Sequence, residues 1–228
     1  MRTMAERTSP LQNRVTPEGD IVALTARGLL MGNRGGRLHR PDFSLGRRRW
    51  SSRQWIACKL AFNGRQRQIM GPASYTELFF LDEATALAAG HRPCFECRRQ
   101  DFLQFATLWA SALGLPQARA TAAAMDARLH DERLCADGSK RTVSAPLDGL
   151  PEGTFVRLAG RPHLVVRDRL VVWQPGGYGP VAGPQPRPDV VEVLTPAAIV
   201  SVLKAGYACG LHPSARDAAA ATDRSRQP

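Results

Sequence analysis

The chain has 228 residues, of which 43% are hydrophobic and 22% charged, and this composition excludes a wholly disordered protein. Lys and Arg number 31 against 20 Asp and Glu, so the formal net charge of +11 favours polyanionic partners. No apolar run approaches the roughly 20 residues that cross a bilayer, and the N-terminus lacks the apolar part of a secretion signal. We therefore expect a cytoplasmic protein with no membrane partner.

The N-terminal segment, residues 1–18, is polar and runs into a turn-like Thr-Pro-Glu-Gly cluster at 16–19, which predicts a flexible arm. We place a first domain at residues 19–135. Four glycines between positions 28 and 36 predict a loop of irregular backbone near its start. His39 follows this loop, and we interpret it either as part of an active-site or phosphate-cradling loop or as part of a tight surface turn.

Arginines are concentrated between Arg27 and Arg53, where eight of them accompany a single acid, Asp42. A source genome rich in G and C would also raise the Arg content, but it would not explain this clustering. The block is typical of a surface that contacts phosphates, because each guanidinium can fork onto a phosphate and release counterions. The candidate contacts within the block are Arg34, Arg37, Arg47, Arg48 and Arg49.

A β-hairpin is predicted over 55–70, because Asn63-Gly64 separates two stretches of alternating apolar and polar residues. This prediction places Cys58 on the first strand of the hairpin. Three helices are expected after it, over Asp82–Gly90, Arg99–Leu113 and Ala118–Leu134.

The C-terminal half changes to the alternating pattern of strands, which predicts a small β-rich domain at 145–213. Three short strands over 154–158, 163–166 and 170–173 are followed by a strand over 190–194. A helix with Thr195 as its N-cap and Pro196 in its first turn is expected to close this domain and to end at Gly206. Residues 214–228 are expected to form a disordered tail or a frayed helix. The fold class is therefore predicted to be α+β.

Five cysteines, an odd number, argue against a disulfide framework and favour a metal or thiol role. Cys94 and Cys97 form a C-x-x-C pair, the unit of structural zinc sites. A redox pair of this spacing is expected at the start of a helix after a strand, whereas this pair follows a helix that ends at Gly90.

The surrounding 20 residues or so resemble the metal-binding domain of the Ada DNA methylphosphotriester repair protein. The similarity rests on Phe79-Phe80, an Ala-rich helix that ends in Ala89-Gly90, and the sequence from Arg92 to Arg98 that reads Arg-Pro-Cys-Phe-Glu-Cys-Arg. The resemblance implies an Ada-like zinc knuckle, with Cys94 and Cys97 as ligands and Arg92 and Arg98 as phosphate contacts. The family's upstream C-x-x-x-C pair is represented here by Cys58 alone.

The remaining zinc ligands are sought among Cys58, His39 and His91, in that order of preference, because three cysteines and one histidine make a closed structural site. An alternative of equal weight is that Cys58 is an ordinary buried cysteine on a strand.

Our leading hypothesis is a zinc-containing nucleic-acid-binding protein, with DNA favoured over RNA and a role in DNA repair or regulation. Arg99 joins Arg92 and Arg98 as a phosphate contact in this hypothesis. The alternative is a metal-dependent or His-dependent enzyme that acts on nucleic acid or a phosphorylated substrate, with His39, His130 and Glu132 as catalytic candidates. Because residues two apart on a helix point in different directions, His130 and Glu132 are not expected to converge by themselves.

Overall fold

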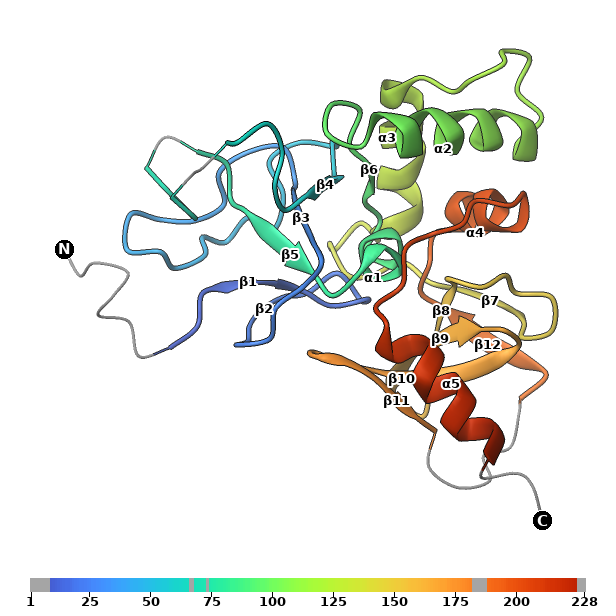
Figure 1. Ribbon diagram of the computed structural model, residues 1–228. Helices are drawn as coiled ribbons and strands as arrows, with labels where there is room; N and C mark the ends of the chain where they lie inside the picture. The colour runs from blue at the N-terminus through green and yellow to red at the C-terminus, as the bar shows by residue number, and fades with distance from the viewer. Residues whose placement is uncertain (1–8, 66–67, 73, 182–187, 225–228) are drawn as a thin grey trace.

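The computed structural model describes residues 9–65, 68–72, 74–181 and 188–224 and is drawn in Figure 1. The fold is α+β, as predicted, with five helices and two six-stranded sheets in this part of the chain. None of the helices found there has the length and apolar character of a membrane span.

The first sheet is made by short strands of the N-terminal half, in the order β2-β1-β5-β3-β4-β6. Its strands are β1 (Gln12–Val15), β2 (Ile21–Ala23), β3 (Leu30–Asn33), β4 (Ile56–Lys59), β5 (Leu78–Phe80) and β6 (Arg92–Pro93). β3 lies antiparallel between β5 and β4, and the two-residue β6 runs parallel to β4 at the edge of the sheet. Two segments far apart in sequence, β4 and β6, therefore lie side by side.

The second sheet is antiparallel throughout, in the order β11-β10-β9-β8-β12-β7. Its strands are β7 (Val143–Pro146), β8 (Phe155–Leu158), β9 (Arg161–Val166), β10 (Arg169–Gln174), β11 (Gly177–Pro180) and β12 (Val190–Val193). Arg167 and Asp168 join β9 to β10 with φ of 47° and 61°, the left-handed backbone of a tight hairpin turn. The strands predicted in this half are confirmed.

The helices begin and end close to the predicted positions. They are α1 (Glu83–Ala88), α2 (Arg99–Ala112), α3 (Ala122–Arg133), α4 (Ala197–Lys204) and α5 (Ser214–Arg224). Asp82 caps α1 by accepting a hydrogen bond from the Thr85 amide at 2.9 Å. The predicted cap of α4 is wrong, because Thr195 accepts from the Phe155 amide instead, and the Glu132 carboxylate accepts from the Ala198 amide in the first turn of α4.

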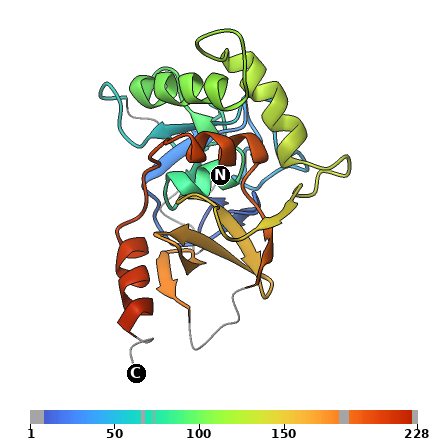
Figure 2. The ribbon, with the colours of Figure 1, turned by 90° about the vertical axis from the view of Figure 1, so that its right-hand side faces the viewer.

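Helices α2, α3 and α4 gather at one end of the molecule, while α5 lies along the second sheet (Figures 1 and 2). The first three enclose an apolar cluster that includes Phe105, Met125 and Ile199. Helix α1 is buried along its whole length, and its Ala84 and Ala88 pack in one cluster with side chains of the second sheet and of α5. Residues from both predicted domains thus share these two clusters.

Three local predictions are corrected by the structure. Within the predicted arm, 12–15 form strand β1, while residues 1–8 lie outside the described residues. Of the predicted tail, 214–224 form helix α5 rather than a disordered segment, and its Ala215 and Ala218 are buried because they pack against the second sheet, while 225–228 lie outside the described residues. Asn63 and Gly64 do form a turn with positive φ, but no strand is found in the described part of 65–72, and β4 pairs with β3 and β6 instead.

Candidate metal centre

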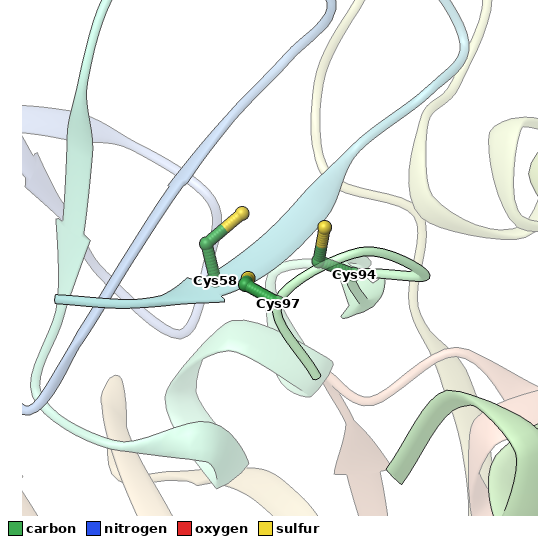
Figure 3. Close-up of side chains that lie close together, drawn as sticks. All are labelled: Cys58, Cys94 and Cys97. Atoms are coloured by element: carbon green, nitrogen blue, oxygen red, sulfur yellow. The ribbon is translucent and has the colours of Figure 1, made fainter. Parts of the chain in front are cut away.

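Cys58, Cys94 and Cys97 come together at the edge of the first sheet, with their sulfur atoms all within 4.8 Å of one another. Figure 3 shows Cys58 on strand β4 and the other two cysteines on the adjoining loop. The parallel pairing of β4 with β6 sets this arrangement, because it aligns Ala57 with Pro93 and brings the Cys94 amide to 2.9 Å from the Ala57 carbonyl oxygen. Among the described residues, no other group of three or more His, Cys, Asp or Glu side chains has metal-binding geometry.

The short loop from Cys94 to Arg98 turns the second and third thiols toward the first. The Arg98 amide donates to the Cys94 carbonyl oxygen at 3.2 Å, which closes the turn before α2. Gly90 allows the reversal that precedes it, with φ of 84° after helix α1. The sequence thus builds the pair from a Gly-terminated helix, a two-residue strand and a tight turn.

Electrostatics in the cluster favour a thiolate at Cys94. Hydrogen bonds from Cys58 and Cys97, together with the amides of Glu96 and Cys97, lower the pKa of Cys94 despite burial. Hydrogen bonds to Cys94 and then to Cys97 raise the pKa of Cys58, whose thiol is the donor. The Lys59 amide donates to the Cys97 sulfur at 3.4 Å. Backbone amides that point at sulfur are the usual support of metal-bound thiolates.

The donor set fits zinc. Zinc–sulfur bonds of about 2.3 Å in a tetrahedron place sulfur atoms roughly 3.8 Å apart, which the three thiols reach with small side-chain shifts from their present spacing of at most 4.8 Å. The three cysteines are also all less than one tenth exposed, and soft, buried thiolates select zinc, copper(I) or iron–sulfur clusters over hard cations.

A cavity of about 610 Å³ opens beside the three thiols. Its walls are mostly apolar and aromatic, with Phe62 and Phe79 among them, and they include the carboxylates of Glu77 and Glu96. Glu77 is buried and accepts from the Met70 amide at 2.6 Å. Sequence reasoning did not find Glu77, because a lone glutamate next to an apolar strand carries no motif.

Neither predicted histidine ligand joins the cluster, so both of these predictions are wrong. The ring of His39 has its two nitrogens engaged by the Thr76 hydroxyl at 2.8 Å and the Gly71 carbonyl oxygen at 3.1 Å. His91 lies under α1, where its Nε2 accepts from Arg34 at 3.3 Å. Burial, then the charge of Arg34, lowers the pKa of His91. Both rings serve the core of the first sheet rather than the thiols.

Three of the predicted phosphate contacts are buried and serve the fold. Arg92 makes a two-pronged ion pair with Asp126, at 2.9 and 2.8 Å, and Arg98 reaches Glu83 at 2.7 Å. Arg34 is 2% exposed and donates to the Gly19 carbonyl oxygen at 2.8 Å. The prediction that these three arginines contact phosphate is therefore wrong, because their guanidiniums are buried and every one of their nitrogens except Arg98 Nη1 donates to a partner inside the protein.

The other predicted arginines remain at the surface. Arg37, Arg47, Arg48 and Arg49 are exposed on the long segment between β3 and β4, and Arg99 is exposed at the start of α2. Arg99 stacks on the ring of Phe95, with its guanidinium carbon 4.7 Å from the ring centroid. These five side chains are open to solvent, as a phosphate contact requires.

The candidate catalytic pair on α3 does not converge, as expected from its spacing. Glu132 accepts from Arg128 at 2.7 Å and from the Ala198 amide at 2.8 Å, so its carboxylate ties α3 to α4. His130 packs edge-on against Trp50, with ring centroids 6.0 Å apart. Neither residue lines the cavity beside the thiols.

No protein-family model matches the chain, and no curated protein or solved structure matches it either. The resemblance to the Ada metal-binding domain therefore rests on the residues around Cys94 and Cys97 alone.

Proposed function

We propose that this chain is a zinc protein that binds nucleic acid, DNA in preference to RNA, with Cys58, Cys94 and Cys97 as zinc ligands. The observation that carries the proposal is the meeting of three buried thiols from two distant segments. Three free thiols stabilise the fold little by lying close together, whereas one tetrahedral metal ion bound to all three neutralises their thiolate charge and fixes their orientation. Zinc supplies structural cross-linking here, and in addition Lewis acidity at its fourth position.

Metal analysis tests the zinc proposal. We expect one zinc per chain in protein prepared without added metal, and loss of that zinc in Cys94→Ser and in Cys58→Ser. Cys135→Ser is the matched control, because this thiol lies outside the three-thiol group. Zinc that is absent from the wild type, or equally retained in Cys58→Ser, contradicts the assignment.

Nucleic-acid binding is supported by the charge of +11 and by the exposed arginines between β3 and β4. Each phosphate contact lowers the slope of log K against log salt by about 0.9 for duplex DNA. We expect replacement of Arg37, Arg47 and Arg48 by Gln to weaken binding and to flatten this slope by about 2 to 3.

A control variant tests whether position matters as well as charge. It replaces three exposed arginines elsewhere, Arg119, Arg161 and Arg216, and so removes the same charge from other surfaces. Equal losses in the two triple variants would reduce the effect to net charge and remove the proposed surface. No measurable affinity for duplex or single-stranded DNA or RNA at low salt would remove the nucleic-acid proposal itself.

The same proposal includes a relationship to the Ada metal-binding domain. The resemblance adds the hypothesis that Cys58 accepts a methyl group from a DNA phosphotriester. Mass spectrometry after exposure to methylated DNA tests this hypothesis, and an unmodified Cys58 dismisses it without touching the zinc assignment.

A second candidate function, a metal-dependent enzyme, is favoured by one feature of the site. The described residues offer three ligands beside a cavity of about 610 Å³, and catalytic zinc sites keep a fourth position for water or substrate. In this alternative the buried Glu77 carboxylate is the candidate proton acceptor. The test is to incubate labelled DNA and RNA with the zinc-loaded wild type and with zinc-loaded Glu77→Gln. An enzyme gives a product with the wild type that the variant fails to form.

A further inference from the structure

A second cavity, of about 460 Å³, lies away from the thiols and shares no lining residue with the first. The turn between β1 and β2, the end of β3, the loop before β4, the end of α3 and strand β8 all contribute to its walls. Its volume falls within the range of about 300 to 1,000 Å³ that small-molecule sites occupy. Parts of the chain more than a hundred residues apart thus enclose one small space.

The walls of this second cavity carry an excess of positive charge. Its acidic lining residues are Glu18 and Asp20. Its basic lining residues are Arg34, Arg49, Arg133, Lys140 and Arg157. Arg157 is paired with Glu192 at 2.7 Å and lies 3.8 Å from Glu18. Within the described residues, the other four cations have no carboxylate within ion-pair distance.

The hydrogen bonds of these unpaired cations go to uncharged groups. Arg133 donates to the carbonyl oxygens of Gly90 and Arg53, at 2.9 and 2.8 Å, and its Nε has no hydrogen-bond partner although the side chain is 1% exposed. Lys140 donates to the Ala88 carbonyl oxygen. Carbonyl oxygens position these side chains, but they do not neutralise them.

Two of the guanidiniums also share one aromatic ring. The guanidinium carbons of Arg34 and Arg133 lie 3.9 and 3.8 Å from the ring centroid of Trp55. Contact with an indole ring stabilises each cation in part, and it holds both guanidinium planes in fixed positions. The cations are therefore preorganised rather than mobile.

Burial, with a smaller contribution from the charge of neighbouring cations, lowers the pKa values of three of these cations. Burial, then the charge of Arg133, lowers the pKa of Arg34 to about 9, and burial lowers the pKa of Arg133 to about 9. Burial and then Arg34 and Arg133 lower the pKa of Lys140 to about 7. Asp20 and Glu18 offset the lowering at Arg34 and at Lys140 only in part. Buried cations that their neighbouring carboxylates do not fully compensate are typical of a site that receives an anion.

We propose that this second cavity binds a phosphate group, carried by a free phosphate, a nucleotide or the end of a nucleic-acid strand. Arg49, Arg133 and Lys140 supply its contacts, since guanidiniums fork onto phosphate oxygens and an ammonium acts as a point charge. Trp50 lines the same space and provides an aromatic wall for whatever carries the phosphate, whereas the Trp55 ring is covered by the guanidiniums of Arg34 and Arg133. This site is independent of the zinc proposal, because none of its residues lies in the thiol cluster.

Titration calorimetry on the full chain tests the site with five probes at constant ionic strength: inorganic phosphate, adenosine 5′-monophosphate, adenosine, and a short oligonucleotide in two forms, with and without a 5′-phosphate. We expect saturable binding of at least one phosphorylated probe, and at least tenfold weaker binding of adenosine or of the unphosphorylated strand. The probe that binds most tightly identifies the carrier of the phosphate.

Three variants make the test specific. Lys140→Met keeps the length of the side chain and removes its charge, and Arg49→Gln changes a side chain that is exposed and does not hold the core. We expect each of them to weaken phosphate binding at least tenfold, while Arg119→Gln, an exposed arginine outside the cavity, leaves it unchanged. Phosphate should also raise the melting temperature of the wild type and not that of Lys140→Met.

Two results would overturn the proposal. One is the absence of saturable binding for every phosphorylated probe, and the other is an affinity that is the same in the wild type and in folded Lys140→Met. A purely structural role of Lys140 predicts a less stable Lys140→Met, whereas a binding role predicts a variant of equal or greater stability that no longer responds to phosphate.

Discussion

Replacement of Arg92 by methionine tests whether this arginine holds the fold or contacts a phosphate. Arg92 and Asp126 are each about 4% exposed, and two hydrogen bonds of 2.9 and 2.8 Å join them. Arg92→Met leaves the Asp126 carboxylate buried without its partner. Removing one member of a buried ion pair costs about 3 to 5 kcal/mol.

For a chain of this length each kcal/mol lowers the melting temperature by about 2 to 4 °C, so we expect a fall of roughly 6 to 20 °C for Arg92→Met. Combining Arg92→Met with Asp126→Leu removes both charges, and we expect the double variant to recover most of the loss. Urea unfolding of the wild type, both single variants and the double variant gives the coupling energy, which we expect to exceed about 2 kcal/mol. A drop of less than about 1 kcal/mol in Arg92→Met, with weaker DNA binding, would refute the structural role.

Three further predictions concern other parts of the fold. Lys140 has a pKa of about 7 in the folded state against 10.5 in the unfolded state, so the folded state binds fewer protons. The free energy of unfolding should therefore rise by about 1–2 kcal/mol from pH 7 to 10, a figure that is discounted because the side chain is only half-buried. Denaturant titrations at several pH values should show this rise in the wild type and a flatter one in Lys140→Met. Gly90→Ala should lower the free energy of unfolding in urea by more than about 2 kcal/mol, because the φ of Gly90 is 84° and a Cβ there would lie 2.6 Å from the Arg133 side chain. Gly114→Ala should lower it less, because Gly114 has a φ of 62° but open space around it. A chain that ends at Pro213 lacks α5 and uncovers the second sheet, so calorimetry should show a lower melting temperature, and an unchanged one would contradict the packing of α5.

The local parts of the fold could be predicted because their signals lie within a few residues of one another. Asp82 at the cap of α1, Gly90 at its end and the alternating residues of β8 to β10 each specify their element from nearby sequence. The partners of β4 could not be predicted in this way. The Asn63-Gly64 turn forms, yet β4 pairs with strands that begin at Leu30 and Arg92, because long-range burial decides strand pairing.

In the candidate sites, too, the features set by nearby residues could be predicted and those set by long-range contacts could not. The Cys94/Cys97 pair follows from its spacing, and the choice of Cys58 follows from the resemblance to the Ada domain, whose upstream cysteines it represents. The cluster in the structure unites the same three residues. The burial of Arg92 could not be foreseen, because its partner Asp126 lies 34 residues away on α3. The second cavity is hidden from the sequence for the same reason, since its cations come from segments as far apart as Arg34 and Arg157.

X-ray absorption at the zinc edge of the purified protein tests the central claim most directly. The three-thiol site predicts one zinc per chain, with three sulfur neighbours at about 2.3 Å and one lighter neighbour at about 2.0 to 2.1 Å. Four sulfur neighbours would require a ligand outside the cluster of Cys58, Cys94 and Cys97, and fewer than three, or no bound zinc, would contradict the account.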